Sequence, residues 1–256
     1  FACLDEAHCI SQWSHNFRPA YLRVCKAGKP SGEAFQSHFP PPFQVLRQRL
    51  GVRCFLGLTA TATAATARDV AQHLGIPPEQ GGGVRSAAVP ANLLLSVSMD
   101  ADREQALLSL LRADPFGSCH PLIVFCTRRE DTERLAALLR SQFPPHPKPL
   151  GKNPGKGKTA GIPGFCSATA YHAGLSGPER RRIQRDFMGG RIRVLVATVA
   201  FGMGLDKADV RGIVHYNIPG NLESYVQEVG RAGRDGSAAR CHLFLEPQVG
   251  AAAGIP

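Results

Sequence analysis

Short apolar runs alternate along the chain with segments in which apolar side chains recur at helical spacing. The runs rich in leucine, valine and isoleucine predict strands at 53–58, 93–98, 122–126, 191–197, 212–216 and 240–245. The helical pattern predicts helices at 62–74, 103–112, 129–143 and 178–188. Because strands that alternate with helices form parallel sheets covered by those helices, the pattern predicts an α/β fold.

Glycine- and proline-rich stretches divide this pattern. The stretch 77–90 separates an incomplete first unit from a fuller second one. It predicts one domain at 1–88, a second at 89–247 and a short tail at 248–256.

Two further segments, 27–44 and 144–168, interrupt the pattern with proline and glycine. Structureless loops of this length are uncommon in compact domains, so we expect each to be a disordered insertion or an error of the gene model. The second contains the run Gly151 to Thr159, which partly matches the phosphate-binding pattern G-x-x-x-x-G-K-[ST]. Lys152 stands in place of the first glycine and no strand precedes the run, so a flexible basic linker is the favoured interpretation.

Charge narrows the classes of partner. The 256 residues carry 30 Lys and Arg against 20 Asp and Glu, a formal net charge of +10, which favours a polyanion such as nucleic acid. With 43% hydrophobic residues the chain can bury a core, yet no apolar stretch approaches the roughly 18 residues that cross a bilayer. The first residues have neither an initiator Met nor the character of a signal peptide, so we expect the chain to begin within a longer gene.

The 8 cysteines form no Cys-x-x-Cys pair, which argues against a zinc site and a dense disulfide framework. We expect reduced thiols in an intracellular protein. Cys3, Cys54 and Cys126 lie inside apolar runs and are expected to pack in the core as small apolar side chains.

Asp5 and Glu6 directly follow the apolar run 1–4, whose pattern is typical of the end of a buried strand. Such carboxylates lie at the C-terminal edge of a sheet, where α/β proteins bind ligands. There one carboxylate can hold Mg²⁺ and the next can orient the water that attacks a phosphate. A helix N-cap is the alternative interpretation of Asp5.

Polar motifs also follow later strands. The threonines of 58–63 can relay hydrogen bonds between a nucleotide site and a neighbouring domain, or can cap the start of a helix. The run 196–206 predicts a strand that leads into a glycine-bearing loop. Arg231 and Arg234 are three positions apart, a spacing that predicts one face of a helical turn from which both can reach phosphate oxygens.

In this order, the blocks 5–25, 45–74, 91–141 and 171–245 resemble the RecQ family of superfamily-two helicases. The resemblance implies tandem RecA-like domains, the first truncated and the second nearly complete. It also implies an ATP-dependent DNA helicase of 3′-to-5′ polarity that uses ATP and Mg²⁺. The implied partners are single-stranded DNA and duplex junctions, with no protein partner specified. The implied setting is DNA repair, recombination or replication in the nucleus, with the cytoplasm as a further location.

Carried over to matching positions, the resemblance assigns Asp5 to Mg²⁺ and Glu6 to the catalytic base. The other positions it implies at the nucleotide or in catalysis are Gly204, Asp206, Gln227, Arg231 and Arg234. Arg234 corresponds to the arginine finger that stabilises the transition state at the γ-phosphate, with Arg231 as its neighbour.

The family's aromatic-rich loop matches 11–21, where Trp13 and Phe17 can stack on unpaired bases and Arg18 can contact a phosphate or a base face. Asn16 stands where family members usually carry an aspartate, so the loop lacks that carboxylate. The further DNA-contacting positions are Thr127, Arg128, His172 and Thr198. The positions that couple DNA binding to hydrolysis are His8, Thr59 and Thr61. For Trp13 alone a buried core aromatic is the alternative, and for the later motifs an ordinary buried strand and turn.

The sequence contains neither the Walker A loop nor the adenine-recognition motif of the family, and no zinc-binding or winged-helix element. Because backbone amides and a Lys of the Walker A loop supply much of the nucleotide affinity, we expect this polypeptide alone to bind ATP poorly and to be inactive. The leading hypothesis is part of a DNA helicase. The alternative is a non-catalytic nucleic-acid-binding isoform or fragment.

Overall fold

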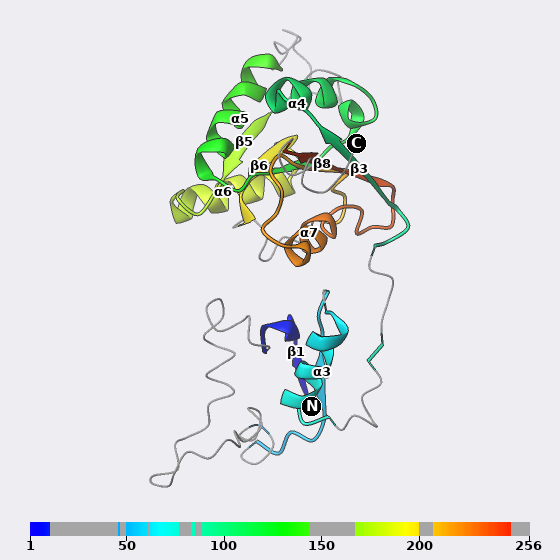
Figure 1. The fold of residues 1–256 in the computed structure, drawn as a ribbon. Coiled ribbons are helices and arrows are strands. Elements are labelled where there is room, and N and C mark those ends of the chain that lie inside the picture. Colours follow the sequence, from blue (N-terminus) through cyan, green and yellow to red (C-terminus); the bar gives the residue numbers. More distant parts are fainter. Residues whose placement is uncertain are drawn as a thin grey trace, which may run out of the picture. The chain divides into compact units, whose positions relative to one another are not determined.

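The computed structural model describes residues 1–10, 46, 50–60, 62–76, 83–84, 89–143, 167–199 and 207–246. The chain divides into two compact units, unit 1 (Phe1–Ala88) and unit 2 (Val89–Pro256), which Figure 1 draws. The predicted insertion at 27–44 and the predicted tail at 248–256 lie outside the described residues.

Unit 1 places β1 (Ala2–Leu4) beside β2 (Phe55–Gly57) as a parallel pair. A short 3-10 helix, η1 (Ala7–Ile10), follows β1, and α3 (Ala64–His73) follows β2. The core of the unit consists of Leu4, Ala7, Ile10, Val70 and Leu74. Because β1 and β2 are parallel, the residues that follow both strands meet at one edge of the pair.

Unit 2 holds, among the described residues, a six-stranded sheet in which every pair of neighbours is parallel. In spatial order its strands are β3 (Leu93–Met99), β8 (Ala239–Leu245), β7 (Gly212–His215), β4 (Leu122–Phe125), β6 (Val194–Ala197) and β5 (Ala168–Tyr171). The central strands β4 and β6 are buried at every position, as expected for strands covered on both faces.

Helices cover the two faces of this sheet (Figure 1). On one face α4 (Arg103–Arg112) and α5 (Arg129–Gln142) bury leucines against alternate residues of β4 and β6, and a 3-10 turn, η3 (Phe116–Ser118), adds Phe116. On the other face α6 (Gly177–Met188) and α7 (Leu222–Val229) bury Ile183, Phe187 and Val229 against the remaining residues of those strands. This is the layered arrangement that an alternating strand and helix pattern produces.

The structure confirms the predicted α/β class and its parallel sheet. The sequence pattern did not predict β5 or α7. The predicted insertion 144–168 extends too far, because Ser167 is described and Ala168 begins β5. Ala168 pairs with Val194 in the sheet and its side chain is buried in the core, so this residue is part of the folded domain and not of an insertion.

The prediction of core packing is wrong for two of the three cysteines. Cys3 and Cys54 are exposed, because the β1 and β2 pair leaves the side chains of these positions outside the core of unit 1. Cys126 is buried, and burial raises the pKa of its thiol far above the ordinary value. Among the described residues, none of the helices is both long and apolar enough to span a bilayer.

Candidate functional site

The two carboxylates predicted to act on a nucleotide lie in a tight turn directly after β1. The backbone N–H of Glu6 donates to Asp5 Oδ1 at 2.9 Å, and Glu6 has a φ of +51°. A residue other than glycine rarely adopts this left-handed conformation, so the surrounding contacts must stabilise it. Two hydrogen bonds to Leu58 do so, one from Leu58 N to Leu4 O at 2.8 Å and one from Ala7 N to Leu58 O at 2.7 Å.

His8 brings this turn together with the residue that follows β2. Its Nδ1 lies 3.3 Å from Glu6 Oε2 and 2.9 Å from the hydroxyl oxygen of Thr59. Glu6 Oε2 is shielded from solvent and accepts no hydrogen bond of good geometry from the described residues. The structure therefore joins the predicted catalytic base to two predicted coupling residues through one imidazole nitrogen. A change at Thr59 can reach the Glu6 carboxylate in this way.

The donor set of this turn fits a magnesium ion that is bound largely by phosphate oxygens and water. Mg²⁺ commonly takes only one or two protein carboxylates in such sites. The Asp5 side chain is exposed after β1, where its carboxylate could supply oxygen ligands. The described residues hold no group of three or more His, Cys, Asp or Glu arranged around a common ion, so a site built wholly from protein side chains is not found among them.

In unit 2, the predicted DNA-contacting residues follow β4, β5 and β6 at the carboxyl edge of the sheet. Thr127 and Arg128 follow β4 and are exposed, with Thr127 N–H donating to Asn217 Oδ1 at 3.1 Å. Thr198 follows β6 and is buried, with its N–H donating to the Tyr171 carbonyl at 3.1 Å. Thr127 and Arg128 are therefore accessible to a nucleic acid, while the Thr198 side chain is largely enclosed.

His172, which follows β5, is also largely buried, and both of its ring nitrogens are engaged. Its Nδ1 accepts the Gly174 N–H at 3.1 Å, so Nε2 carries the proton that points to Glu133 Oε1 at 2.9 Å. The imidazole thereby fixes the turn 172–174 against α5. The geometry gives His172 a role in shaping this turn, besides the contact with DNA that the resemblance implies.

The two candidate arginines lie after α7, outside the helix. The helix ends at Val229 with Gly230 as its C-cap, and Gly233, between the arginines, has a φ of +59°. The prediction that Arg231 and Arg234 share one face of a helical turn is therefore wrong, because the left-handed glycine redirects the chain between them. Arg231 is half-buried and Arg234 is exposed, with Arg234 Nε donating to Gly230 O at 3.3 Å.

A buried pair that the sequence analysis did not predict anchors the end of α7 to the sheet. His215 Nε2, at the end of β7, lies 2.8 Å from Glu228 Oε2, and their side chains are only 1% and 7% exposed. The His215 ring stacks on Phe125 at 5.5 Å and contacts the Tyr225 ring at 5.0 Å. The Glu228 carbonyl accepts the Arg231 N–H at 3.2 Å, so this pair and the arginine motif share one backbone segment. Glu228 follows Gln227 in α7, so no local pattern of the sequence distinguishes it from a surface residue.

Several predicted residues cannot be placed. Those that lie outside the described residues are Trp13, Phe17, Arg18, Thr61, Gly204 and Asp206. Gln227 is described and is half-buried on α7.

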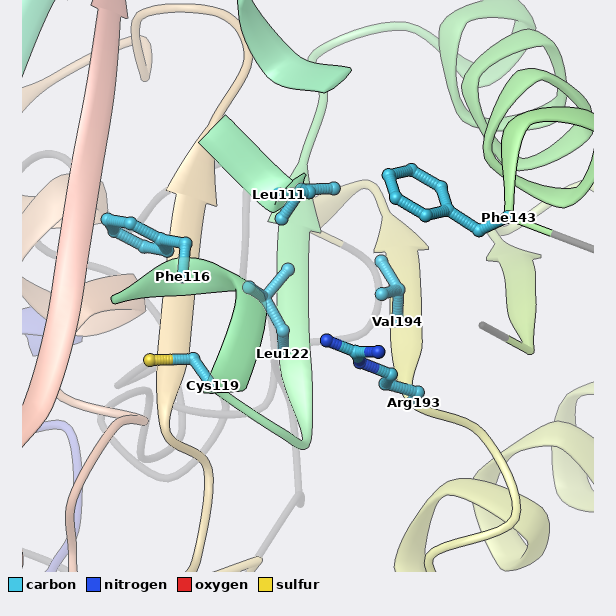
Figure 2. A pocket seen from close by; sticks show the side chains of 7 residues that line it. All are labelled: Leu111, Phe116, Cys119, Leu122, Phe143, Arg193 and Val194. Carbon is cyan, nitrogen blue, oxygen red and sulfur yellow. The ribbon is translucent and has the colours of Figure 1, made fainter. Parts of the chain in front are cut away.

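Figure 2 shows a small cavity at the opposite edge of the unit 2 sheet. Leu122 and Val194, which line it, are the first residues of β4 and β6, whereas the candidate residues follow the last. Its volume of about 10 Å³ is roughly that of one water-sized probe, so it is a gap in packing and not a nucleotide site. Burial raises the pKa of the lining thiol of Cys119, and nearby arginines oppose this shift.

Comparison with known proteins shows that this chain belongs to a family of helicases. Residues 102–236 match the family model described as the helicase conserved C-terminal domain. The ATP-dependent DNA helicase Q4 of Homo sapiens is 56% identical over 97% of this chain, and that of Mus musculus is 53% identical over 97%. The ATP-dependent DNA helicase RecQ of Pasteurella multocida is 34% identical over 96% of the chain. The chain spans 18% of the length of the two mammalian relatives and 32% of the bacterial one.

Solved structures give the fold. S. cerevisiae Dbp5 bound to RNA and ADP BeF3 aligns with 99% of this chain and 55% of its own, at a TM-score of 0.60 and 18% identity. A variant of that protein in the same bound state aligns at a TM-score of 0.64 and 19% identity. At these identities the likeness establishes the RecA-like helicase fold and nothing more specific.

Proposed function

Because the chain belongs to the RecQ family of helicases and contains their conserved C-terminal domain, we propose that it forms part of a motor that couples ATP hydrolysis to the unwinding of duplex DNA. The proposal includes 3′-to-5′ polarity, single-stranded DNA and duplex junctions as substrates, and a role in DNA repair, recombination or replication in the nucleus. Protein partners are not part of it.

The single observation that carries the proposal is the linkage of Glu6, His8 and Thr59. A general base must be held within reach of the attacking water, and the strained turn after β1 fixes Glu6 in one conformation. Its Oε2 atom is shielded beside His8, while the side chain as a whole is 29% exposed, so the carboxylate can still meet a water molecule through its accessible part.

Each residue then has a distinct part in the reaction. When bound, Mg²⁺ neutralises negative charge on the phosphates of ATP. Asp5 would hold this ion, and Glu6 orients the attacking water and takes its proton. Arg234, which is exposed after α7, donates hydrogen bonds to the γ-phosphate as charge develops there. The remaining nucleotide contacts come from Gln227 and Arg231. Gly204 and Asp206, which lie outside the described residues, complete them.

Each unit has its own residues for contact with DNA. Thr127 and Arg128 are exposed at the carboxyl edge of the unit 2 sheet and contact phosphates, with His172 and Thr198 supporting the neighbouring turns. Trp13, Phe17 and Arg18 bind unpaired bases and phosphate. His8, Thr59 and Thr61 transmit the occupancy of the DNA site to Glu6.

A Glu6→Gln substitution in the intact protein tests this function. Gln is similar in shape but cannot take a proton, so ATP and single-stranded DNA should still bind while ATP hydrolysis and strand unwinding are lost. Asp69→Asn, which removes a carboxylate from α3 of the same unit, is the matched control and should hydrolyse ATP normally. The alternative function, non-catalytic nucleic-acid binding, predicts no DNA-stimulated hydrolysis in the unsubstituted protein either.

A further inference from the structure

Arg234 lies in an exposed turn, and the side chains of this turn are not packed in the core. Positions 234–238 are all exposed, so the geometry of the turn depends on hydrogen bonds and on the ion pair of Arg211 with Asp235, whose carboxylate also accepts the Ser237 N–H at 3.0 Å. Gly236 N–H donates to Gly233 O at 2.9 Å within the turn, and Gly233 N–H donates to Val210 O at 2.9 Å outside it. Gly233 O thus accepts one hydrogen bond from within the turn, and a further donor reaches both this carbonyl and that of Ser237.

The side chain of Asn92 holds both ends. Its Nδ2 donates one hydrogen to Gly233 O and the other to Ser237 O, each at 2.9 Å. Both acceptors are carbonyl oxygens, so the amide nitrogen must be the atom that faces them. The two carbonyls bracket the three residues 234–236, and Asn92 therefore spans the base of the turn that carries Arg234.

Asn92 is itself fixed by the sheet. It directly precedes β3, and its own carbonyl accepts the Ala239 N–H, at the start of β8, at 3.0 Å. The next residue, Leu93, pairs with Ala239 in the parallel ladder. We call the two hydrogen bonds from Asn92 the clamp on the turn. Asn92 is 141 and 145 positions away in sequence from its two acceptors, and it is held in place by the start of the β3 and β8 pair.

Gly233 is matched to this clamp. A Cβ at this position would lie 2.5 Å from Asn92 Nδ2 and 2.7 Å from Ser237 O, distances at which backbone or clamp would have to move. Its φ of +59° is also a conformation that side chains disfavour. Both properties require glycine beside Asn92.

We propose that Asn92 is a positioning residue for the arginine finger: its amide group sets the turn from which Arg234 reaches the γ-phosphate. This inference rests on the proposed function of Arg234 in ATP hydrolysis. Asn92 contacts neither ATP nor DNA in this scheme and acts only through the turn. Preorganisation of a charged donor matters because a displacement of about 1 Å can lower the rate of a reaction by about a hundredfold.

Asn92→Asp in the intact protein tests the clamp. The substitution keeps the shape but places carboxylate oxygens against two carbonyls, so the turn should open. We expect kcat for DNA-stimulated ATP hydrolysis to fall by about tenfold to a hundredfold, with KM for ATP and Kd for single-stranded DNA within about twofold. Asn221→Asp is the matched control, because an aspartate at this N-cap of α7 still accepts the Ser224 N–H and kcat should be unchanged.

The double variant Asn92→Asp, Arg234→Ala separates positioning from a general loss of structure. If Asn92 acts only through Arg234, the double variant is no slower than Arg234→Ala alone. An additional loss in the double variant, or a normal kcat for Asn92→Asp, would overturn the proposal. Should Asn92→Asp fail to fold, Asn92→Ala removes the two donors without adding charge and is measured in the same way.

Hydrogen exchange of residues 233–238 keeps this inference distinct from the proposed function. Exchange of the Gly236 amide should be faster in Asn92→Ala than in the unsubstituted protein and unchanged in Asn221→Asp. Unchanged exchange in Asn92→Ala would overturn the clamp whatever the activity. A normal kcat for Arg234→Ala would instead overturn the proposed function.

Discussion

The Nδ1 atom of His8 lies 2.9 Å from the hydroxyl oxygen of Thr59, which is 51 positions away in the chain. The same nitrogen lies 3.3 Å from Glu6 Oε2. One imidazole therefore joins the turn after β1 to the residue that follows β2. In the proposed motor this contact is the part of unit 1 through which DNA binding affects hydrolysis.

Thr59→Val removes the hydroxyl and keeps the shape of the side chain. We expect the stimulation of ATP hydrolysis by DNA to fall by roughly 5- to 150-fold, because couplings between sites are typically 1 to 3 kcal/mol, while affinity for single-stranded DNA is kept. ATPase rates with and without single-stranded DNA, together with binding isotherms, measure this. Thr66→Val, which removes a hydroxyl from α3, is the control. Equal loss of DNA affinity and stimulation would assign Thr59 to DNA binding and not to coupling.

Because His215 and Glu228 form a buried pair, substitutions at the two ends of α7 should lower the free energy of unfolding by different amounts. Glu228→Ala leaves the His215 imidazole buried without its partner, so the free energy of unfolding should fall by about 2 to 4 kcal/mol. Glu223→Ala, on the exposed first turn of the same helix, should change it by less than about 0.5 kcal/mol. Urea unfolding followed by circular dichroism measures both. Similar values for the two variants would mean that the pair does not anchor α7.

His242 predicts a dependence of stability on pH. It lies 2.9 Å from Ser96 Oγ and 3.1 Å from Ser98 Oγ, and burial lowers the pKa of its imidazole, partly offset by Asp100. The unfolded chain then binds a proton more readily than the folded one. The stability contributed by neutral His242 is complete above about pH 6.5 and is lost as the pH falls below that value.

The melting temperature between about pH 7.5 and pH 5 checks this pH dependence, since that interval brackets the ordinary pKa of histidine. The difference in melting temperature between the unsubstituted protein and His242→Gln should shrink as the pH falls. A difference that stays constant over this interval would contradict the role given to the burial of His242.

The sequence pattern predicted the parts of the fold in which a strand or helix is long or uniformly apolar. The runs of β4 and β6 are buried on both faces and are apolar throughout, and α4 has leucines at regular helical spacing, so local pattern is enough to predict them. The strand β5 contains alanine, threonine and tyrosine in place of such a run, and α7 spans only 8 residues. Their packing against distant residues decides their structure.

The candidate site also has contacts that the local sequence predicted and contacts that it did not. Asp5, Glu6 and His8 are adjacent in sequence, so their grouping was predictable, and the place of Thr59 followed from parallel strands. The contacts of Asn92 with the turn after α7 and of His215 with Glu228 join residues that no local pattern relates. The error on Arg231 and Arg234 has a simple cause: spacing was used to infer a helix beyond the glycine at which α7 ends.

In the aromatic-rich loop, substitutions of Trp13 and Arg18 are expected to affect DNA binding in different ways. Trp13→Ala should lower the affinity for single-stranded DNA by about 1 to 3 kcal/mol with little change in salt dependence, because stacking is lost and charge is not. Arg18→Ala should weaken binding and reduce the salt slope by about one unit, because a phosphate contact is lost. Isotherms at several salt concentrations distinguish these effects. If Trp13→Ala lowers only the melting temperature, Trp13 is a core residue.

The most direct test of the account is kcat for ATP hydrolysis by Arg234→Ala in the intact protein. Removal of an arginine finger lowers kcat by roughly a thousandfold or more, and single-stranded DNA should still bind. Arg191→Ala is the matched control, since Arg191 is exposed and pairs with Asp186 at 2.6 Å. Only Arg234→Ala should stop turnover, while Arg191→Ala should keep it. A near-normal kcat for Arg234→Ala would contradict the central claim, that the turn after α7 supplies the group that stabilises the transition state.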